Sequence, residues 1–267
     1  MELNIVEPQV QDRRLVLNVE TFTKSAELFK DIESKLKLLI IGAGATGSHI
    51  AKAVAYSAPL FKEIRLIDGD VFQIHNVGNQ SCSVTDDLGK NKALAVAEAI
   101  ERHQAVKIDF DSVFVTDENM VELLQLDEDT VLVLAIDNID VTKKILELCA
   151  DMPVYCIVNT GLPLNVKYIA MAQGEVRLMI TPEDIQEYLE TVKDVNQGDI
   201  DERVMSELRA CRTQQFYPVV LLVSAVANQV INTIAYFFNN PLEDGLELSK
   251  RYIISGAIPG IRTENTY

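Results

Sequence analysis

The chain has 267 residues, of which 48% are hydrophobic and 24% are charged, a composition typical of a globular protein with a full core. Its formal net charge of −16 repels the phosphate backbones of DNA and RNA, which argues against a nucleic-acid partner. The first residues, MELNIVEPQVQDRR, contain no apolar run, so we expect no signal peptide.

Two features of the composition could mislead. The cysteines Cys82, Cys149, Cys156 and Cys211 form no Cys-x-x-Cys pair, so we expect no zinc site and interpret them as reduced thiols of a cytoplasmic protein. Residues 216–238 carry no charge over 23 positions, a length that could span a bilayer. Amides at Asn228, Gln229 and Asn232 would be costly in lipid, so we expect a buried or interface helix there and no membrane association.

In chain order, apolar runs alternate with helical patterns as far as residue 160. Continuous Val/Ile/Leu runs predict strands over 36–41, 63–68, 105–115, 130–137 and 153–159. Helical spacing predicts helices over 46–56, 90–104, 116–125 and 141–150, the third beginning with Thr116 as its N-cap. Strand and helix in alternation indicate a parallel sheet covered on both faces.

The pattern changes after Gly161. The apolar runs 164–172 and 175–180 flank Gln173-Gly174 and predict an antiparallel hairpin. Helices are expected over 181–193 and 199–211, and a final strand over 250–258. We therefore predict an α/β, Rossmann-like fold with a mostly parallel sheet, extended by antiparallel strands in the C-terminal half. One domain, 1–267, would comprise an N-terminal extension (1–36), a nucleotide-binding half (37–160) and a dimer or partner half (161–267).

The stretch LLIIGAGATGSHIAKAV, residues 38–54, reads as a strand, a glycine turn and a helix. Gly42, Gly44 and Gly47 match the Gly-x-Gly-x-x-Gly turn that cradles phosphate at a helix N-terminus. Asp68 follows about 20 residues later, as the ribose-binding acid of dinucleotide folds does, although it could also cap a strand end. In an open parallel sheet these residues meet at the carboxyl ends of the strands, where ligands bind.

Two further residues allow alternative interpretations. Asp137 follows a fully apolar strand and could hold Mg²⁺ by oxygen ligation, or it could cap the next helix in competition with Asn138 or Asp140. Lys92 stands at the head of a helix, where a cation opposes the helix dipole. It would be tolerated there if it met a phosphate, and otherwise it is a solvated surface lysine.

Four motifs in order, GAGATGS, LIDGDVFQIHNVGNQ, LGKNKA and AIDNID, resemble the adenylating domains of ThiF, MoeB and the ubiquitin-activating enzymes. The resemblance covers nearly the whole chain from Arg13 on. It implies that Asp68 binds the ATP ribose and that Lys92 contacts the phosphates. It also implies that Asp137 holds Mg²⁺. The remaining residues of the nucleotide site would be the three turn glycines together with Asp70, Asn76, Asn79 and Gln80.

The resemblance also implies a homodimer in which Arg13 or Arg14 of the partner enters the site. The chain departs from the family pattern at Asn79, where the usual arginine grips the triphosphate, and at Ala45, where the usual residue is glycine. The family's paired zinc cysteines are absent as well. Lys90 or the partner's Arg14 could compensate for the missing arginine. Cys211, between Arg209 and Arg212, could form a thioester or be a helix-end thiol without a role.

By this resemblance, the expected activity is ATP- and Mg²⁺-dependent adenylation of the C-terminal carboxylate of a small ubiquitin-like or sulfur-carrier-like protein, with release of pyrophosphate. Two alternatives stay open. Because of Asn79, the chain could be a weak or inactive nucleotide-binding scaffold of the same fold. An NAD(P)-dependent oxidoreductase would explain the glycine turn and Asp68, but not the later motifs.

Overall fold

A computed structural model shows the arrangement of the chain. It describes residues 36–56, 58, 61–77, 80, 87–136, 138–150, 155–161, 171–179, 181–192, 228, 230, 251–257 and 260–266. Of the expectations above, those on Arg14, Asn79, Asp137 and Cys211 and on the helix over 199–211 lie outside the described residues.

The described elements follow the expected alternation through the first half. They are β1 (Lys37–Ile41), α2 (Ala45–Ala55), β2 (Glu63–Ile67), the 3₁₀ turn η2 (Ile74–Asn76), α3 (Lys92–Gln104), β3 (Asp109–Asp111), α4 (Met120–Leu124), β4 (Thr130–Leu134), α5 (Ile139–Cys149) and β5 (Tyr155–Gly161). The second half contributes β6 (Met171–Met179), α6 (Pro182–Val192), β7 (Arg251–Ala257) and β8 (Gly260–Thr266).

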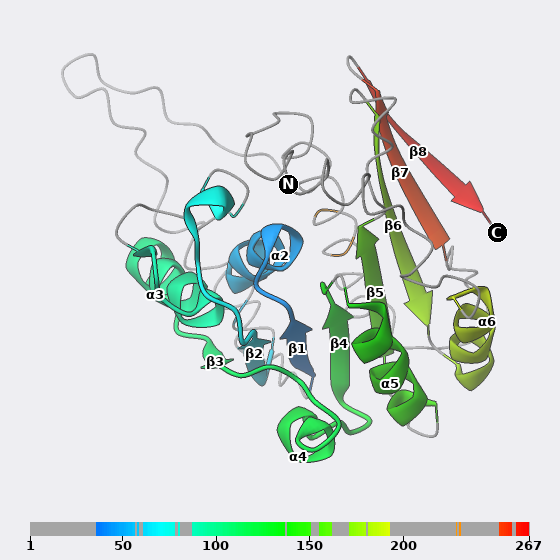
Figure 1. Ribbon diagram of the computed structural model, residues 1–267, viewed down its shortest axis with the longest axis horizontal. Coiled ribbons are helices and arrows are strands. Elements are labelled where there is room, and N and C mark those ends of the chain that lie inside the picture. The colour runs from blue at the N-terminus through cyan, green and yellow to red at the C-terminus, as the bar shows by residue number, and fades with distance from the viewer. Residues whose placement is uncertain are drawn as a thin grey trace, which may run out of the picture.

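These strands form one sheet in the order β3-β2-β1-β4-β5-β6-β7-β8, which Figure 1 shows from the β3 edge to the β8 edge. The pairings from β3 to β5 are parallel, and those from β5 to β8 are antiparallel. The order reverses at β1, which lies between β2 and β4. This reversal is the switch point at which open α/β sheets bind ligands.

Alternate residues of the central strands face two separate cores. Leu38 and Ile40 of β1 pack with α2 and α3 in one cluster. Leu39 and Ile41 pack with α4, α5 and α6 in the other. The central strands β1 and β4 are therefore apolar from their second residue on because both faces of the sheet are covered, which confirms the predicted Rossmann-like α/β class.

Three expectations about individual elements are wrong. β6 runs through Gln173 and Gly174 without a turn, and Gly174 pairs with Gly161 of β5 and with Ile254 of β7. A glycine inside a strand lets neighbouring backbones approach closely, and here it was mistaken for a turn. β3 is only three residues long, and the residues after it form a loop.

The third correction concerns Thr116. Helix α4 begins at Met120 with Asn119 as its N-cap. The side-chain oxygen of Asn119 accepts a hydrogen bond of 2.8 Å from the Thr116 N–H. The asparagine therefore orders the turn before the helix, in the reverse of the expected roles.

Most of the uncharged segment 216–238 lies outside the described residues. Of the part that is described, Asn228 is helical and exposed, whereas Val230 is helical, fully buried and part of the α2–α3 core cluster. Among the described residues, no helix is long and apolar enough to cross a membrane.

Candidate nucleotide-binding site

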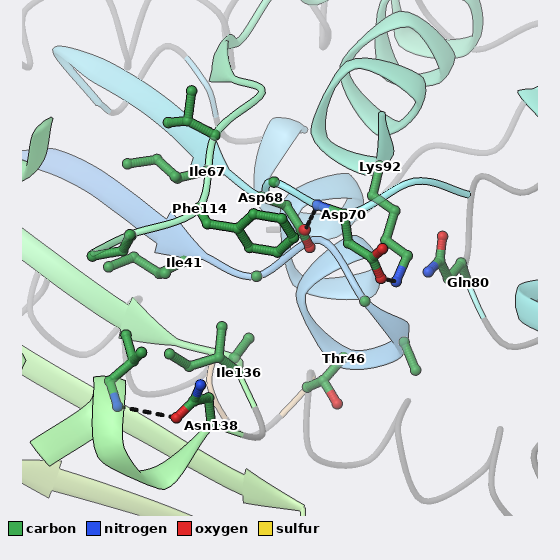
Figure 2. A pocket seen from close by; sticks show the side chains of 18 of the residues that line it. Ile41, Thr46, Ile67, Asp68, Asp70, Gln80, Lys92, Phe114, Ile136 and Asn138 are labelled. Carbon is green, nitrogen blue, oxygen red and sulfur yellow. Dashed lines mark hydrogen bonds and ion pairs between the residues drawn. The ribbon is translucent and has the colours of Figure 1, made fainter. Parts of the chain in front are cut away.

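A cavity of about 690 Å³ opens at the carboxyl ends of β1, β2 and β4. It brings together most of the predicted nucleotide-site residues that the structure describes, as Figure 2 shows for several of them. The predicted residues that line it are Gly42, Gly44, Asp68, Asp70, Asn76, Gln80 and Lys92. Segments far apart in the sequence thus converge on one concave surface.

The three glycines of the turn have three different structural reasons to be glycine. Gly42 has φ +99°, and a Cβ there would lie 2.5 Å from the Ala135 carbonyl oxygen. A Cβ at Gly47 would lie 1.8 Å from the Gly42 carbonyl oxygen, so helix α2 can pack against the turn only if residue 47 has no side chain. A Cβ at Gly44 would meet no protein atom within 4 Å. Gly44 therefore faces open space in the cavity, where a ligand can approach the backbone.

Asp68 ties the glycine turn to the loop after β2. Its Oδ2 accepts a hydrogen bond of 2.6 Å from the Ala43 N–H, and its Oδ1 accepts one of 2.8 Å from the Asp70 N–H. A carboxylate has lone pairs beyond these two bonds, so Asp68 can still accept from a ligand hydroxyl. Its position beside the turn at the end of β2 is the one expected for a ribose-binding acid.

Asn91 is a positioning residue that none of the predicted motifs singles out. Its amide group donates to the Asp68 carbonyl at 2.7 Å and to the Asp70 carbonyl at 3.1 Å. Its side-chain oxygen caps α3 by accepting from the Leu94 N–H at 3.1 Å. Asn91 thus fixes the start of α3 against the loop that carries both aspartates. An asparagine directly before an apolar-periodic run is a recognisable N-cap signal.

Lys92, the first residue of α3, forms an ion pair with the Asp70 carboxylate (Figure 2). The lysine is buried, with its side chain 11% exposed, whereas the side chain of Asp70 is 48% exposed. The interpretation of Lys92 as a solvated surface lysine is therefore wrong. An ammonium group in a concave site beside a helix N-terminus suits an anionic ligand.

Lys90 does not line the cavity. Its ammonium group donates to Asp87 at 2.9 Å and to Glu98 at 2.8 Å, and these carboxylates raise its pKa, Glu98 most. Arg102 also reaches the fully buried Asp87, at 3.3 Å. The described contacts therefore give Lys90 a role in holding the loop before α3. They do not support Lys90 as a replacement for the missing phosphate-gripping arginine.

Two further polar residues of the cavity, Asn76 and Gln80, follow β2 in the sequence. Asn76 accepts a hydrogen bond of 2.9 Å from the Gln73 N–H, and the Gln80 N–H donates to the Asn76 carbonyl at 3.3 Å. Gln80 is only 6% exposed, and its side chain lies beside the Asp70–Lys92 pair in Figure 2. Both predicted residues therefore line the same cavity as Lys92.

The other part of the lining is apolar and was not predicted. It includes Val113, Phe114 and Val115 from the loop after β3, together with Ile41 and Ile136. Phe114 is 63% exposed, and in Figure 2 its ring lies beside Asp68. A Cβ at Gly69 would lie 2.4 Å from this ring, so glycine lets the ring rest on the backbone. Within a run expected to be a strand, Phe114 carried no signal of a site.

Asn138 caps α5, since its side-chain oxygen accepts from the Val141 N–H at 3.1 Å, and it also lines the cavity. The cap of α5 is therefore Asn138, which removes the competing interpretation of Asp137 as that cap. Among the described residues, no group of three or more His, Cys, Asp or Glu side chains could hold a metal ion. Mg²⁺ commonly uses only one or two carboxylates together with substrate phosphates, so a magnesium site need not contain such a group.

Residues 16–251 match the model of the ThiF family. The chain belongs to this family. Among curated proteins it resembles the NEDD8-activating enzyme E1 catalytic subunits of Caenorhabditis elegans (31% identity over 94 residues) and Arabidopsis thaliana (33% over 88 residues). These matches cover 35% and 33% of the ThiF-family chain but only 21% and 19% of the relatives.

Solved structures resemble the fold over a longer span. The Microcin C7 biosynthetic enzyme MccB in complex with N-formylated MccA matches with a TM-score of 0.61 and 17% identity, over 93% of the chain and 70% of MccB. Selenomethionine PaaA matches with a TM-score of 0.58 and 20% identity, over 97% of the chain and 87% of PaaA. Escherichia coli MccB with ATP matches with a TM-score of 0.57 and 21% identity, over 90% of the chain and 66% of that MccB structure. At these identities, the likeness shows a shared fold.

Proposed function

We propose that this ThiF-family chain uses Mg²⁺ and ATP to adenylate the C-terminal carboxylate of a small ubiquitin-like or sulfur-carrier-like protein. The observation that carries the proposal is the presence, in one cavity, of an open glycine backbone at Gly44 and a buried ammonium group at Lys92. The names of the similar proteins agree with this proposal, because the E1 subunits are called activating enzymes and MccB was solved with ATP.

In the proposed reaction a carboxylate oxygen attacks the α-phosphorus of ATP. The bond from that phosphorus to the bridging oxygen of the β-phosphate breaks, and pyrophosphate leaves with the electron pair. The nucleophile requires no general base, since a C-terminal carboxyl group has a pKa of about 3.5 and is already ionised. Catalysis then consists of positioning and charge neutralisation. Lys92 would neutralise phosphate charge, and the backbone near Gly44 would approach the phosphates.

The two ends of the cavity suit the two ends of ATP. The aromatic face of Phe114 and the neighbouring valines would hold the adenine, since a flat apolar base stacks on such a surface. Asp68, next to the ring, would accept from the ribose hydroxyls. The Lys92 end would then hold the phosphates, with Asn76 and Gln80 as polar neighbours.

Mg²⁺ would supply charge neutralisation at the phosphates when bound. Asp137 is the proposed ligand, because it comes three residues after the last residue of β4, Leu134, and precedes the capping residue Asn138. We further propose a cytoplasmic homodimer in which the partner's Arg14 completes the site. An arginine of that kind would supply the bidentate phosphate contact that Asn79 cannot.

A second candidate function is a nucleotide-binding scaffold with little or no turnover. The ion pairs of Lys90 with Asp87 and Glu98 favour it, because they withdraw one of the two cations that could have replaced the missing arginine. Losing one preorganised charge stabiliser costs on the order of 10²–10³ in rate.

The deciding experiment is exchange of labelled pyrophosphate into ATP by the purified chain, with and without a ubiquitin-like protein from its own genome. Exchange that depends on the protein carboxylate supports adenylation, and a substrate with an amidated C-terminus is the matched control. ATP binding without exchange supports the scaffold. Calorimetric preference for NAD over Mg²⁺-bound ATP contradicts both and favours an oxidoreductase.

A further inference from the structure

The cavity contains an ion pair whose carboxylate lies beside any phosphate that binds the ammonium group. Lys92 is the cation that the cavity offers among its described lining residues, and its ammonium group contacts the Asp70 carboxylate. Because an ammonium group has three N–H donors, a phosphate oxygen that binds Lys92 shares its single positive charge with the Asp70 carboxylate. Asp70 also lines the cavity, so its negative charge lies beside any ligand that binds Lys92.

We propose that Asp70 is a competing counter-ion that weakens the binding of metal-free polyphosphate and so makes nucleotide binding depend on a divalent cation. The inference rests on the proposed function, because it takes the ligand of this cavity to be a nucleoside triphosphate. It assigns to Asp70 a role in selecting the charge state of the ligand.

The alternative role for Asp70 would be to hold Lys92 in place, and the backbone contacts argue against it. The Lys92 N–H donates to the Asp70 carbonyl at 2.8 Å, and Asn91 binds the carbonyls of Asp68 and Asp70. These bonds fix the start of α3 without the Asp70 carboxylate. Because the Lys92 side chain is 11% exposed, surrounding atoms also confine its stem.

The geometry of Asp70 suits a group that yields to a ligand. Its side chain is 48% exposed, so water can solvate the carboxylate while the ammonium group binds a phosphate. Its Oδ1 accepts from the Val71 N–H at 2.8 Å, a bond that keeps the carboxylate near the cavity. A cation bound with the phosphates would then offset the repulsion between the carboxylate and the ligand.

The test measures the affinity of pyrophosphate and of ATP by calorimetry, each with Mg²⁺ and with EDTA. In Asp70→Asn we expect metal-free affinity for both ligands to rise by about two- to fivefold, the effect of removing one partly exposed charge pair. Affinity with Mg²⁺ should change less than twofold. Asp70→Ser repeats the test with a hydroxyl that can still accept from the Val71 N–H.

The matched control is Asp117→Asn. Asp117 pairs with Lys144 at 2.7 Å on the exposed surface, and neither residue lines the cavity. This variant removes the same charge from the chain and should leave all four affinities unchanged. Lys92→Met should abolish pyrophosphate binding, alone and combined with Asp70→Asn.

Weaker or unchanged metal-free binding in folded Asp70→Asn and Asp70→Ser overturns the inference, since the carboxylate would then position the lysine or do nothing. Absence of pyrophosphate and ATP binding in every variant overturns it as well. Tighter metal-free binding without any pyrophosphate exchange supports the inference while contradicting the proposed adenylation. Exchange by the wild type with no effect at Asp70 contradicts the inference alone.

Discussion

The glycine turn gives the sharpest prediction, because two of its glycines face different surroundings. Gly44→Ala adds a Cβ that meets no protein atom within 4 Å, at a backbone φ of −70° that alanine adopts readily. Replacing this glycine lowers the entropy of the unfolded chain, which favours folding, while alanine is the poorer N-cap. These opposing effects should leave the free energy of unfolding within about 1 kcal/mol of the wild type.

Gly47→Ala is the matched variant. Its Cβ would lie 1.8 Å from the Gly42 carbonyl oxygen and 3.3 Å from the Ala135 side chain. The first contact is with backbone that is itself fixed, since the Gly42 N–H donates to the Ile67 carbonyl at 2.8 Å. Helix α2 would have to move away from the turn, at a cost of about 3 kcal/mol or more.

The two variants should therefore separate binding from stability. Gly44→Ala should fold normally and bind ATP about 10- to 100-fold more weakly, because its methyl group keeps the phosphates from the backbone donors, each worth about 1.5–3 kcal/mol. Gly47→Ala should unfold at clearly lower denaturant concentration. Denaturant titration and calorimetry with Mg²⁺-bound ATP measure the two effects. Wild-type ATP affinity in Gly44→Ala would refute the placement of the phosphates at this turn.

Three further substitutions test the nucleotide site, and a fourth tests the stability of the fold. Phe114→Ala should weaken ATP binding about tenfold while leaving pyrophosphate binding unchanged; an equal loss for both ligands contradicts the adenine assignment. Asp137→Ala should remove the Mg²⁺ dependence of ATP binding, and a surviving dependence places the metal elsewhere. Asn79→Arg should tighten ATP binding or speed adenylation by one to two orders of magnitude, the effect of a charge-assisted bond, whereas no gain in turnover favours the scaffold. The ion pair with Lys37 holds the pKa of Asp127 below its usual value, so this carboxylate stabilises the fold above about pH 4, and the contribution disappears as pH falls through the lowered pKa. Asp127→Asn should then cost about 0.5–1 kcal/mol at pH 7 and less at pH 2, as read from denaturant titrations at both pH values.

The parallel half of the fold was predictable because burial on both faces leaves a strong signal. β1 and β4 are apolar at nearly every position, so both strands and the points where they end can be recognised in the sequence. The positions of Asp68 and Asp70 just after β2 could be predicted from these strand patterns. Strand ends in a parallel sheet meet at one edge, so the site could be located without any knowledge of side-chain contacts.

The contacts that complete the site were not predictable in the same way. Phe114 reaches the cavity because β3 ends at Asp111 and the chain then turns back over Gly69, which hydrophobic periodicity cannot show. Asn91 could be read as a cap, but its two bonds to the loop after β2 depend on tertiary placement. Gly174 gave the opposite error, since a glycine paired with Gly161 across two strands looks in sequence like a turn.

Negative charge outweighs positive charge among the described residues that line the cavity. Its described lining contains the carboxylates of Asp68 and Asp70 and the ammonium group of Lys92, so it is net negative, as is the chain with its charge of −16. A triphosphate entering such a cavity is repelled unless positive charge comes with it or from elsewhere. Mg²⁺ and the partner's Arg14 are the two sources proposed above, and the cavity charge explains why both would be needed in a chain that has Asn79 in place of an arginine. A metal-dependent, dimer-dependent nucleotide affinity is then the expected behaviour, and a monomer that binds metal-free ATP tightly would contradict it.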